Sequence, residues 1–104
     1  MANVKATFYL PLKDNVGRDL GAEISQVEDR CFIEFGGWTQ LGFFKGAWRM
    51  VDGERRFDTC AVYSILLPAS RIVDLELILC DFKVAALQEA IYLEIEHQVD
   101  VRFL

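Results

Sequence analysis

Two runs of alternating apolar and polar residues decide the fold, and both lie in QLGFFKGAWRMVDGERRFDTCAVYSILL, residues 40–67. The pair Asp52-Gly53 separates them, and Asp-Gly between alternating runs is a strong signal for a β-hairpin. A two-residue type I′ turn at this pair would align residues whose numbers sum to 105. Trp48 would then face Phe57 on an aromatic core side, and the opposite side of the hairpin would be mixed.

The apolar residues outside this stretch change their period in a fixed order. They alternate over residues 6–12, follow a helical period over 20–35 and again over 70–87, and alternate once more towards the C-terminus. The order β-α-β-β-α-β is that of a ferredoxin-like α+β sandwich. We therefore expect a single domain, residues 1–104, in which two helices cover one face of an antiparallel sheet.

The final alternating run leaves two arrangements open at residues 96–98. These residues can form the loop of a hairpin that adds an extra C-terminal strand. They can also belong to one long strand that carries His97 on its inner face. An interrupted strand or a hairpin is favoured, because a loop at 96–98 pairs apolar with apolar residues, for example Ile95 with Val99.

The composition argues against several classes of protein. A net charge of −5 on 104 residues disfavours nucleic acid as a partner unless a local basic patch overrides it. The three cysteines are far apart and form no Cys/His pattern, so neither a metal nor a cofactor is expected. No run approaches the roughly 20 apolar residues of a membrane span, and the N-terminus shows no signal-peptide pattern. We expect a cytoplasmic protein.

The second helix carries one apolar stripe more than a sheet-covering helix needs. The additional stripe runs from Val73 to Leu87 and must pack against the first helix or against another molecule. We therefore expect a homodimer, formed through this stripe or through the sheet face that the helices leave open. The interface candidates are Phe43, Val62, Val73, Leu77 and Val84.

The open face of the sheet is also expected to hold a small anionic ligand. Across the predicted hairpin Arg49 faces Arg56, and paired guanidinium groups suit a carboxylate or a phosphate. The alternative is an arginine pair that nearby acidic residues simply balance. The candidate ligand-binding residues are Tyr9, Lys45, Arg49, Arg56, Asp58 and Tyr92.

Two further positions carry polar groups that chemistry could use. His97 is the only imidazole, but no Ser, Cys or Asp stands near it at a diagnostic spacing. Gln88-Glu89 lies between the second helix and the last strand, where it could bind a polar ligand or close the end of the helix. No residue is assigned a catalytic role.

Three short motifs lie between residues 35 and 95: GGWT at 36–39, GAW at 46–48 and QEAI at 88–91. Together they resemble the GGxT, GxW and QE pattern of a family of small uncharacterised bacterial proteins. That family has no assigned activity, so the resemblance implies no catalytic residue. The architecture is also similar to that of dimeric α+β barrels, whose sheets pack face to face and sometimes enclose a small-molecule pocket.

These observations give three hypotheses for the function. The first is a non-enzymatic binding or accessory domain that acts as a homodimer and binds a small anionic ligand or a protein partner. The second is a small-molecule enzyme of the α+β barrel type, with Arg49 or Arg56 anchoring the substrate and Tyr9, Tyr92 or His97 moving protons. The third is a protein inhibitor of the phage or toxin–antitoxin type that acts through its acidic surface.

Overall fold

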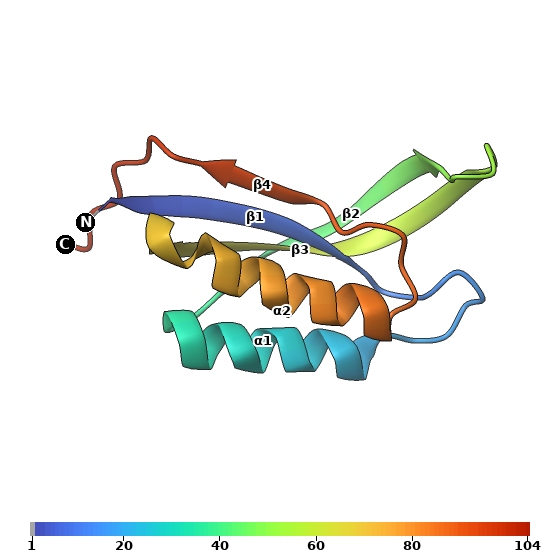
Figure 1. Cartoon of the computed structure of the whole chain (residues 1–104), viewed down its shortest axis with the longest axis horizontal. Coiled ribbons are helices and arrows are strands. Elements are labelled where there is room, and N and C mark those ends of the chain that lie inside the picture. Colours follow the sequence, from blue (N-terminus) through green and yellow to red (C-terminus); the bar gives the residue numbers. More distant parts are fainter. Residues whose placement is uncertain (1) are drawn as a thin grey trace.

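The computed structural model describes residues 2–104, which form one four-stranded sheet with two helices on one of its faces (Figure 1). The strands lie in the order β2-β3-β1-β4, and every neighbouring pair is antiparallel. This arrangement confirms the predicted βαββαβ, ferredoxin-like α+β fold. In chain order the elements are β1 (Asn3–Pro11), α1 (Gly21–Phe35), β2 (Thr39–Arg49), β3 (Arg55–Pro68), a 3-10 turn (Ala69–Arg71), α2 (Ile72–Ala85) and β4 (Leu93–Glu96).

The core lies between the sheet and the helices, because alternate residues of the two central strands point towards α1 and α2. In the register of β1 and β3, Phe8 lies opposite Tyr63, and the two buried rings stack with centroids 5.6 Å apart. The buried core side chains of these strands are Val4, Ala6, Phe8, Leu10, Ala61, Tyr63, Ile65 and Leu67. The helices contribute Ile24, Val27, Cys31, Leu75, Ile78, Leu79 and Phe82.

The two helices lie side by side and are joined along their polar edges. Arg30 Nη1 lies 2.8 Å from Asp81 Oδ2, and Arg71 Nη2 lies 2.7 Å from Glu34 Oε2. The additional apolar stripe of α2 does not take part in this contact. Its exposed residues are Val73, Leu77, Val84 and the following Leu87. Of the two partners expected for this stripe, the first helix is therefore not the one.

The predicted register of the hairpin is wrong by one residue, because its turn has three residues, Val51–Gly53, and not two. The Met50 N–H donates to the Glu54 carbonyl (2.8 Å), and Gly53, at φ +87°, closes the turn with an N–H bond to the Met50 carbonyl (2.9 Å). A type I turn followed by a left-handed glycine gives a loop of this length. The Asp-Gly signal thus identified the turn but not its length.

A one-residue shift moves every side chain of β2 to the other face of the sheet. Trp48 lies opposite Arg56, and Phe44 lies opposite Cys60, so both aromatic residues are on the open face. Phe43, Lys45 and Arg49 belong to the ladder positions on the helix side. The predicted pairing of Arg49 with Arg56 is therefore wrong, because Arg49 lies opposite Arg55.

Strand β4 ends at Glu96, and residues 97–104 form no strand. Neither the C-terminal hairpin nor the single long strand predicted around His97 is present. The physical reason lies in the neighbouring strand: Glu96 pairs with Lys5, and β1 begins only two residues earlier, at Asn3. Residues beyond Glu96 would therefore have almost no part of β1 left to pair with.

The hydroxyl of Tyr63 is the main polar group on the helix side of the sheet. It donates to the Glu28 carboxylate and accepts a bond from Gln40 Nε2 (3.2 Å). The Trp38 ring packs edge-on against the Tyr63 ring, with centroids 5.5 Å apart. Burial, reinforced by the Glu28 carboxylate, raises the pKa of Tyr63 to about 12.

We expect Tyr63→Phe to lower the free energy of unfolding by about 1 kcal/mol near neutral pH, because the carboxylate loses its donor. The folded-state pKa of about 12 lies above the unfolded value of about 10. The phenol's contribution is therefore complete below pH 10 and is lost as the pH rises through 12. Urea unfolding at pH 7 and at pH 10–12 should show the gap between wild type and variant narrowing only in the alkaline range. A difference in unfolding free energy that stays constant with pH would contradict the raised pKa of Tyr63. Tyr9→Phe serves as the control.

Candidate functional site

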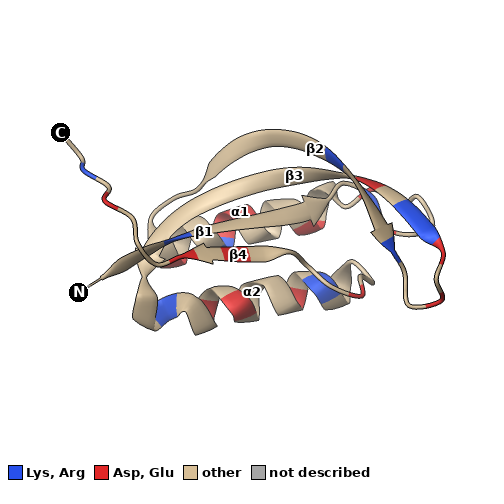
Figure 2. Ribbon diagram, turned by 90° about the horizontal axis from the view of Figure 1, so that it is seen from above, with Lys and Arg blue, Asp and Glu red and all other residues tan. Residues whose placement is uncertain are grey.

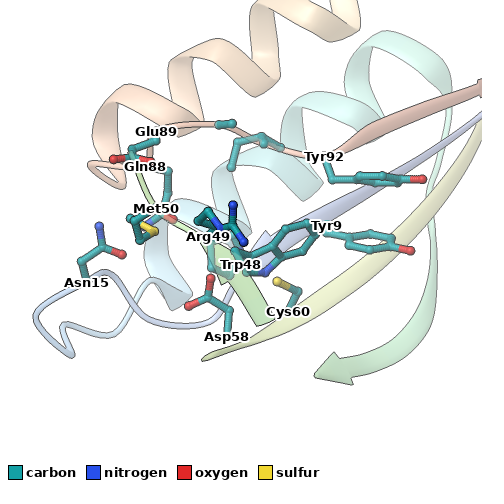
Figure 3. Close-up of a pocket in the computed structure, with 13 residues that line it drawn as sticks. Tyr9, Asn15, Trp48, Arg49, Met50, Asp58, Cys60, Gln88, Glu89 and Tyr92 are labelled. Carbon is teal, nitrogen blue, oxygen red and sulfur yellow. The ribbon is translucent and has the colours of Figure 1, made fainter. Parts of the chain in front are cut away.

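A cleft of about 270 Å³ opens on the helix-free face of the sheet, at the end nearest the hairpin turn (Figure 3). Its walls come from four parts of the chain that are distant in sequence: the end of β1 with the loop that follows, the end of β2, the start of β3, and the segment between α2 and β4. The lining residues are Tyr9, Pro11, Asn15, Trp48, Arg49, Met50, Asp58, Cys60, Gln88, Glu89, Ala90, Ile91 and Tyr92.

Aromatic rings form one wall of the cleft. Tyr9 and Tyr92 stack with centroids 4.4 Å apart, and Phe44 meets Tyr9 edge-on at 6.1 Å. The Trp48 ring lies over Gly46, since a Cβ on that glycine would be 3.2 Å from Trp48 Nε1. The missing side chain at Gly46 therefore makes room for the tryptophan to lie along the strand.

Three charged residues line the cleft: Arg49, Asp58 and Glu89. No hydrogen bond or ion pair joins the side chain of Arg49, Asp58 or Glu89 to any other group of residues 2–104. Burial raises the pKa of Asp58, although the charge of Arg56 opposes the shift. Figure 3 shows Arg49, Trp48 and Asp58 in the middle of the lining residues.

The thiol of Cys60 lies at the bottom of the cleft and is buried. Burial raises its pKa to about 11, and the charge of Asp58 acts in the same direction. A thiol with this pKa is protonated near neutral pH, and the thiolate is the reactive form. Cys60 therefore shapes the cleft but has no nucleophilic character there.

The loop between β1 and α1 is held in place by Asp14, whose side chain is almost fully buried. Asp14 Oδ1 accepts the N–H groups of Val16 (3.0 Å) and Arg18 (2.8 Å), and the backbone bond from Arg18 is the largest cause that lowers its pKa. Arg18 also donates from Nη2 to the Ala85 carbonyl at the end of α2 (3.1 Å). One ordered loop thus links the cleft to the helix that precedes Gln88.

The same loop is fastened to the hairpin on its other side. Arg56 Nη1 donates to the Asn15 carbonyl (2.7 Å), so that Asn15 borders the cleft. Basic residues of β2 and β3 gather near this end of the hairpin (Figure 2). Arg56 is therefore a neighbour of the cleft that positions its rim, and its guanidinium is already engaged.

The segment that follows the C-terminus of α2 forms the fourth wall of the cleft. The N–H of Gln88 donates to the Lys83 carbonyl (2.9 Å) and that of Leu87 to the Val84 carbonyl (3.2 Å), which closes the helix in a Schellman motif. Leu87 occupies the left-handed position at φ +55°, where glycine is the usual residue. Gln88-Glu89 therefore both follows the helix closure and lines the cleft, and both roles considered for this pair are compatible.

The structure brings together four of the six predicted ligand-binding residues: Tyr9, Arg49, Asp58 and Tyr92 all line the cleft. Lys45 does not line the cleft. Lys45 and Arg49 both occupy helix-side ladder positions, but Arg49 is the last residue of β2, at the end of the sheet where the cleft opens, and Lys45 lies four residues away from that end. Trp48 was missed as a site residue because the predicted register gave it to the core. Cys60 was expected on the open face, where it lies, but was interpreted only as a small buried thiol. His97 follows β4 and does not line the cleft.

The five residues predicted to form a dimer interface agree only in part with the positions expected for them. Val62 lies on the open face, as expected, but is fully buried, and Phe43 is on the helix side of β2 and not on the open face where it was expected. Val73, Leu77 and Val84 are exposed on α2, as expected. The residues of two sequence motifs meet at the cleft: Trp48 from GAW, and residues 88–91 as a whole from QEAI.

No protein-family model matches the chain, and no curated protein or solved structure shows significant similarity to it. Within residues 2–104, no three His, Cys, Asp or Glu side chains gather as the ligands of a metal ion would. None of the helices in that range combines the length and the apolar character required to cross a membrane.

We expect Leu87→Gly to raise the free energy of unfolding by about 1 kcal/mol. A Cβ in the left-handed conformation costs roughly 1–2 kcal/mol, and the greater freedom of glycine in the unfolded chain offsets part of the gain. Leu87→Ala is the matched control, because it removes the exposed side chain but keeps the Cβ. Urea unfolding of the two variants should separate them, and equal stability would contradict a strained helix closure.

Proposed function

We propose that the protein is a small non-enzymatic binding domain that holds a small anionic ligand in the open-face cleft and acts as a homodimer. One observation carries the proposal: Arg49, whose guanidinium makes no hydrogen bond or ion pair within residues 2–104, lines a cleft walled by aromatic rings. A planar guanidinium binds a carboxylate through two parallel hydrogen bonds. Apolar walls with a few placed polar groups are typical of small-molecule sites.

The shape and charge of the cleft restrict the class of ligand that it suits. Stacked Tyr9 and Tyr92 and the Trp48 ring offer flat apolar surfaces, which suit a planar body. The Asp58 carboxylate and Glu89 disfavour a second negative charge and can accept a hydrogen bond from a ligand hydroxyl or amide. A volume near 270 Å³ lies just below the range of about 300–1,000 Å³ that is usual for ligand sites, so the ligand must be small. We therefore propose a small, flat monoanion such as an aromatic carboxylate.

The homodimer and the location of the protein are further parts of the proposal. Apolar side chains exposed on α2 and on β2 support a homodimer, since a monomer rarely exposes large contiguous apolar surface. The cysteines Cys31, Cys60 and Cys80 are all unpaired, which supports a cytoplasmic location. Two motifs of the resemblance to small bacterial proteins converge on the cleft, so we propose that such relatives share this site.

The ligand proposal predicts that benzoate binds and that its neutral analogue benzamide binds about tenfold more weakly, because only benzoate forms a charge-assisted pair with Arg49. Backbone amide shifts in an NMR titration should move at the cleft residues, with Trp48 among them. Arg49→Gln should remove the preference for benzoate. Arg55→Gln is the matched control, since Arg55 lies opposite Arg49 on β3 but does not line the cleft. No shift at the cleft with either compound, or an equal effect of both substitutions, would refute the proposal.

A further inference from the structure

The outer edge of β2 is the least protected part of the sheet. β2 is an edge strand of 11 residues, and nearly all of its side chains are exposed. Phe43, Phe44 and Trp48 are 60%, 46% and 40% exposed, respectively. A long edge strand with large apolar side chains is a template for pairing with another strand, and proteins normally shorten, charge or cover such an edge. The opposite edge, β4, has only four residues.

The backbone groups on this edge follow from the register. The Met50 N–H donates to the Glu54 carbonyl, so even-numbered residues of β2 bond to β3. The odd-numbered residues therefore point their N–H and C=O groups away from the sheet. At the other end a β-bulge between Gln40 and Gly42 interrupts the ladder. The regular part of the edge is Phe43–Arg49, and its midpoint is Gly46.

A twofold axis at Gly46 is the antiparallel arrangement of two β2 edges that pairs the whole regular stretch without placing like charges opposite each other. An antiparallel pair of β2 strands with its twofold axis at Gly46 uses the whole regular stretch, and it sets Phe44 against Trp48 and Lys45 against Ala47. An axis at Lys45 would place two lysines opposite each other, and an axis at Ala47 would place Lys45 opposite Arg49. Like charges directly opposite each other are destabilising.

We propose that β2 pairs with the β2 strand of a second copy about a twofold axis at Gly46, which joins the two sheets into one of eight strands. The inference rests on the homodimer of the proposed function and names its surface. In this register Phe43 of one copy occupies the ladder position opposite Arg49 of the other, so no like charges face each other there. On the open side the partner subunit's Phe44 lies beside Trp48, so that each copy extends the aromatic wall of the other's cleft.

Disulfide cross-linking tests the register directly. In a Cys80→Ser background, which removes the exposed native thiol, K45C and A47C are prepared separately. The proposed pairing of the two β2 strands brings residue 45 of one copy opposite residue 47 of the other at a Cα separation of about 5.5 Å. This distance is within the range for a disulfide. The mixed sample should form a covalent dimer under mild oxidation, and neither variant should do so alone. T59C mixed with A47C is the control, because Thr59 lies opposite Lys45 on β3, one strand inward from the edge.

Sedimentation separates this proposal from the homodimer in general. Wild type should sediment as a dimer at tens of micromolar. A47P should sediment as a folded monomer, because proline removes an N–H that points out from the edge of β2. L77K should remain a dimer, because Leu77 lies on α2 and not on this edge. A wild-type dimer that L77K dissociates and the mixed pair does not cross-link would place the interface on α2 and overturn the proposal. A wild-type monomer would overturn both the β2 pairing and the homodimer. The proposed ligand binding in the cleft is tested independently, by the NMR titration with benzoate and benzamide.

Discussion

The three-residue turn at Val51–Gly53 is the constraint on which the rest of the open face depends. Its closing bonds fix Met50 opposite Glu54, and an antiparallel ladder then leaves no freedom in how the remaining residues of β2 pair with β3 until the bulge. The left-handed Gly53 makes this turn possible, since a side chain at φ +87° would be strained. Asp52 supports it by accepting the Glu54 N–H at 2.9 Å.

The cleft and the exposed edge both follow from that register. With Trp48 on the open face, its ring lies over Gly46 and, on the same face, completes an aromatic wall with Tyr9 of β1 and Tyr92 from the segment before β4. The same alternation turns the backbone groups of the odd residues of β2 outwards. The proposed ligand site and the proposed strand-pairing surface therefore both depend on the register of β2, and both include Trp48.

The order of the elements, the core stripes of the helices and the surplus stripe of α2 could all be predicted from periodicity, because burial imposes the periods of two and 3.6 residues. The faces of β3 were predicted correctly, so Asp58 and Arg56 lie on the open side as expected. The faces of β2 were not, because Asp-Gly is compatible with turns of two and of three residues and the choice reverses the strand. Nor could the sequence show that Gln88-Glu89 lines the same cleft as Trp48, since this depends on the tertiary placement of the α2 terminus.

The register of β2 against β3 is thus the central claim, and one NMR measurement tests it. Residues that face each other without mutual hydrogen bonds have Cα atoms about 4.5 Å apart, which brings their α-protons into close contact. The three-residue turn makes Ala47 and Phe57 such a pair. A strong nuclear Overhauser effect between the α-protons of Ala47 and Phe57 is the predicted result. The same effect between Trp48 and Phe57 would return Trp48 to the core side and contradict both the cleft and the edge described above.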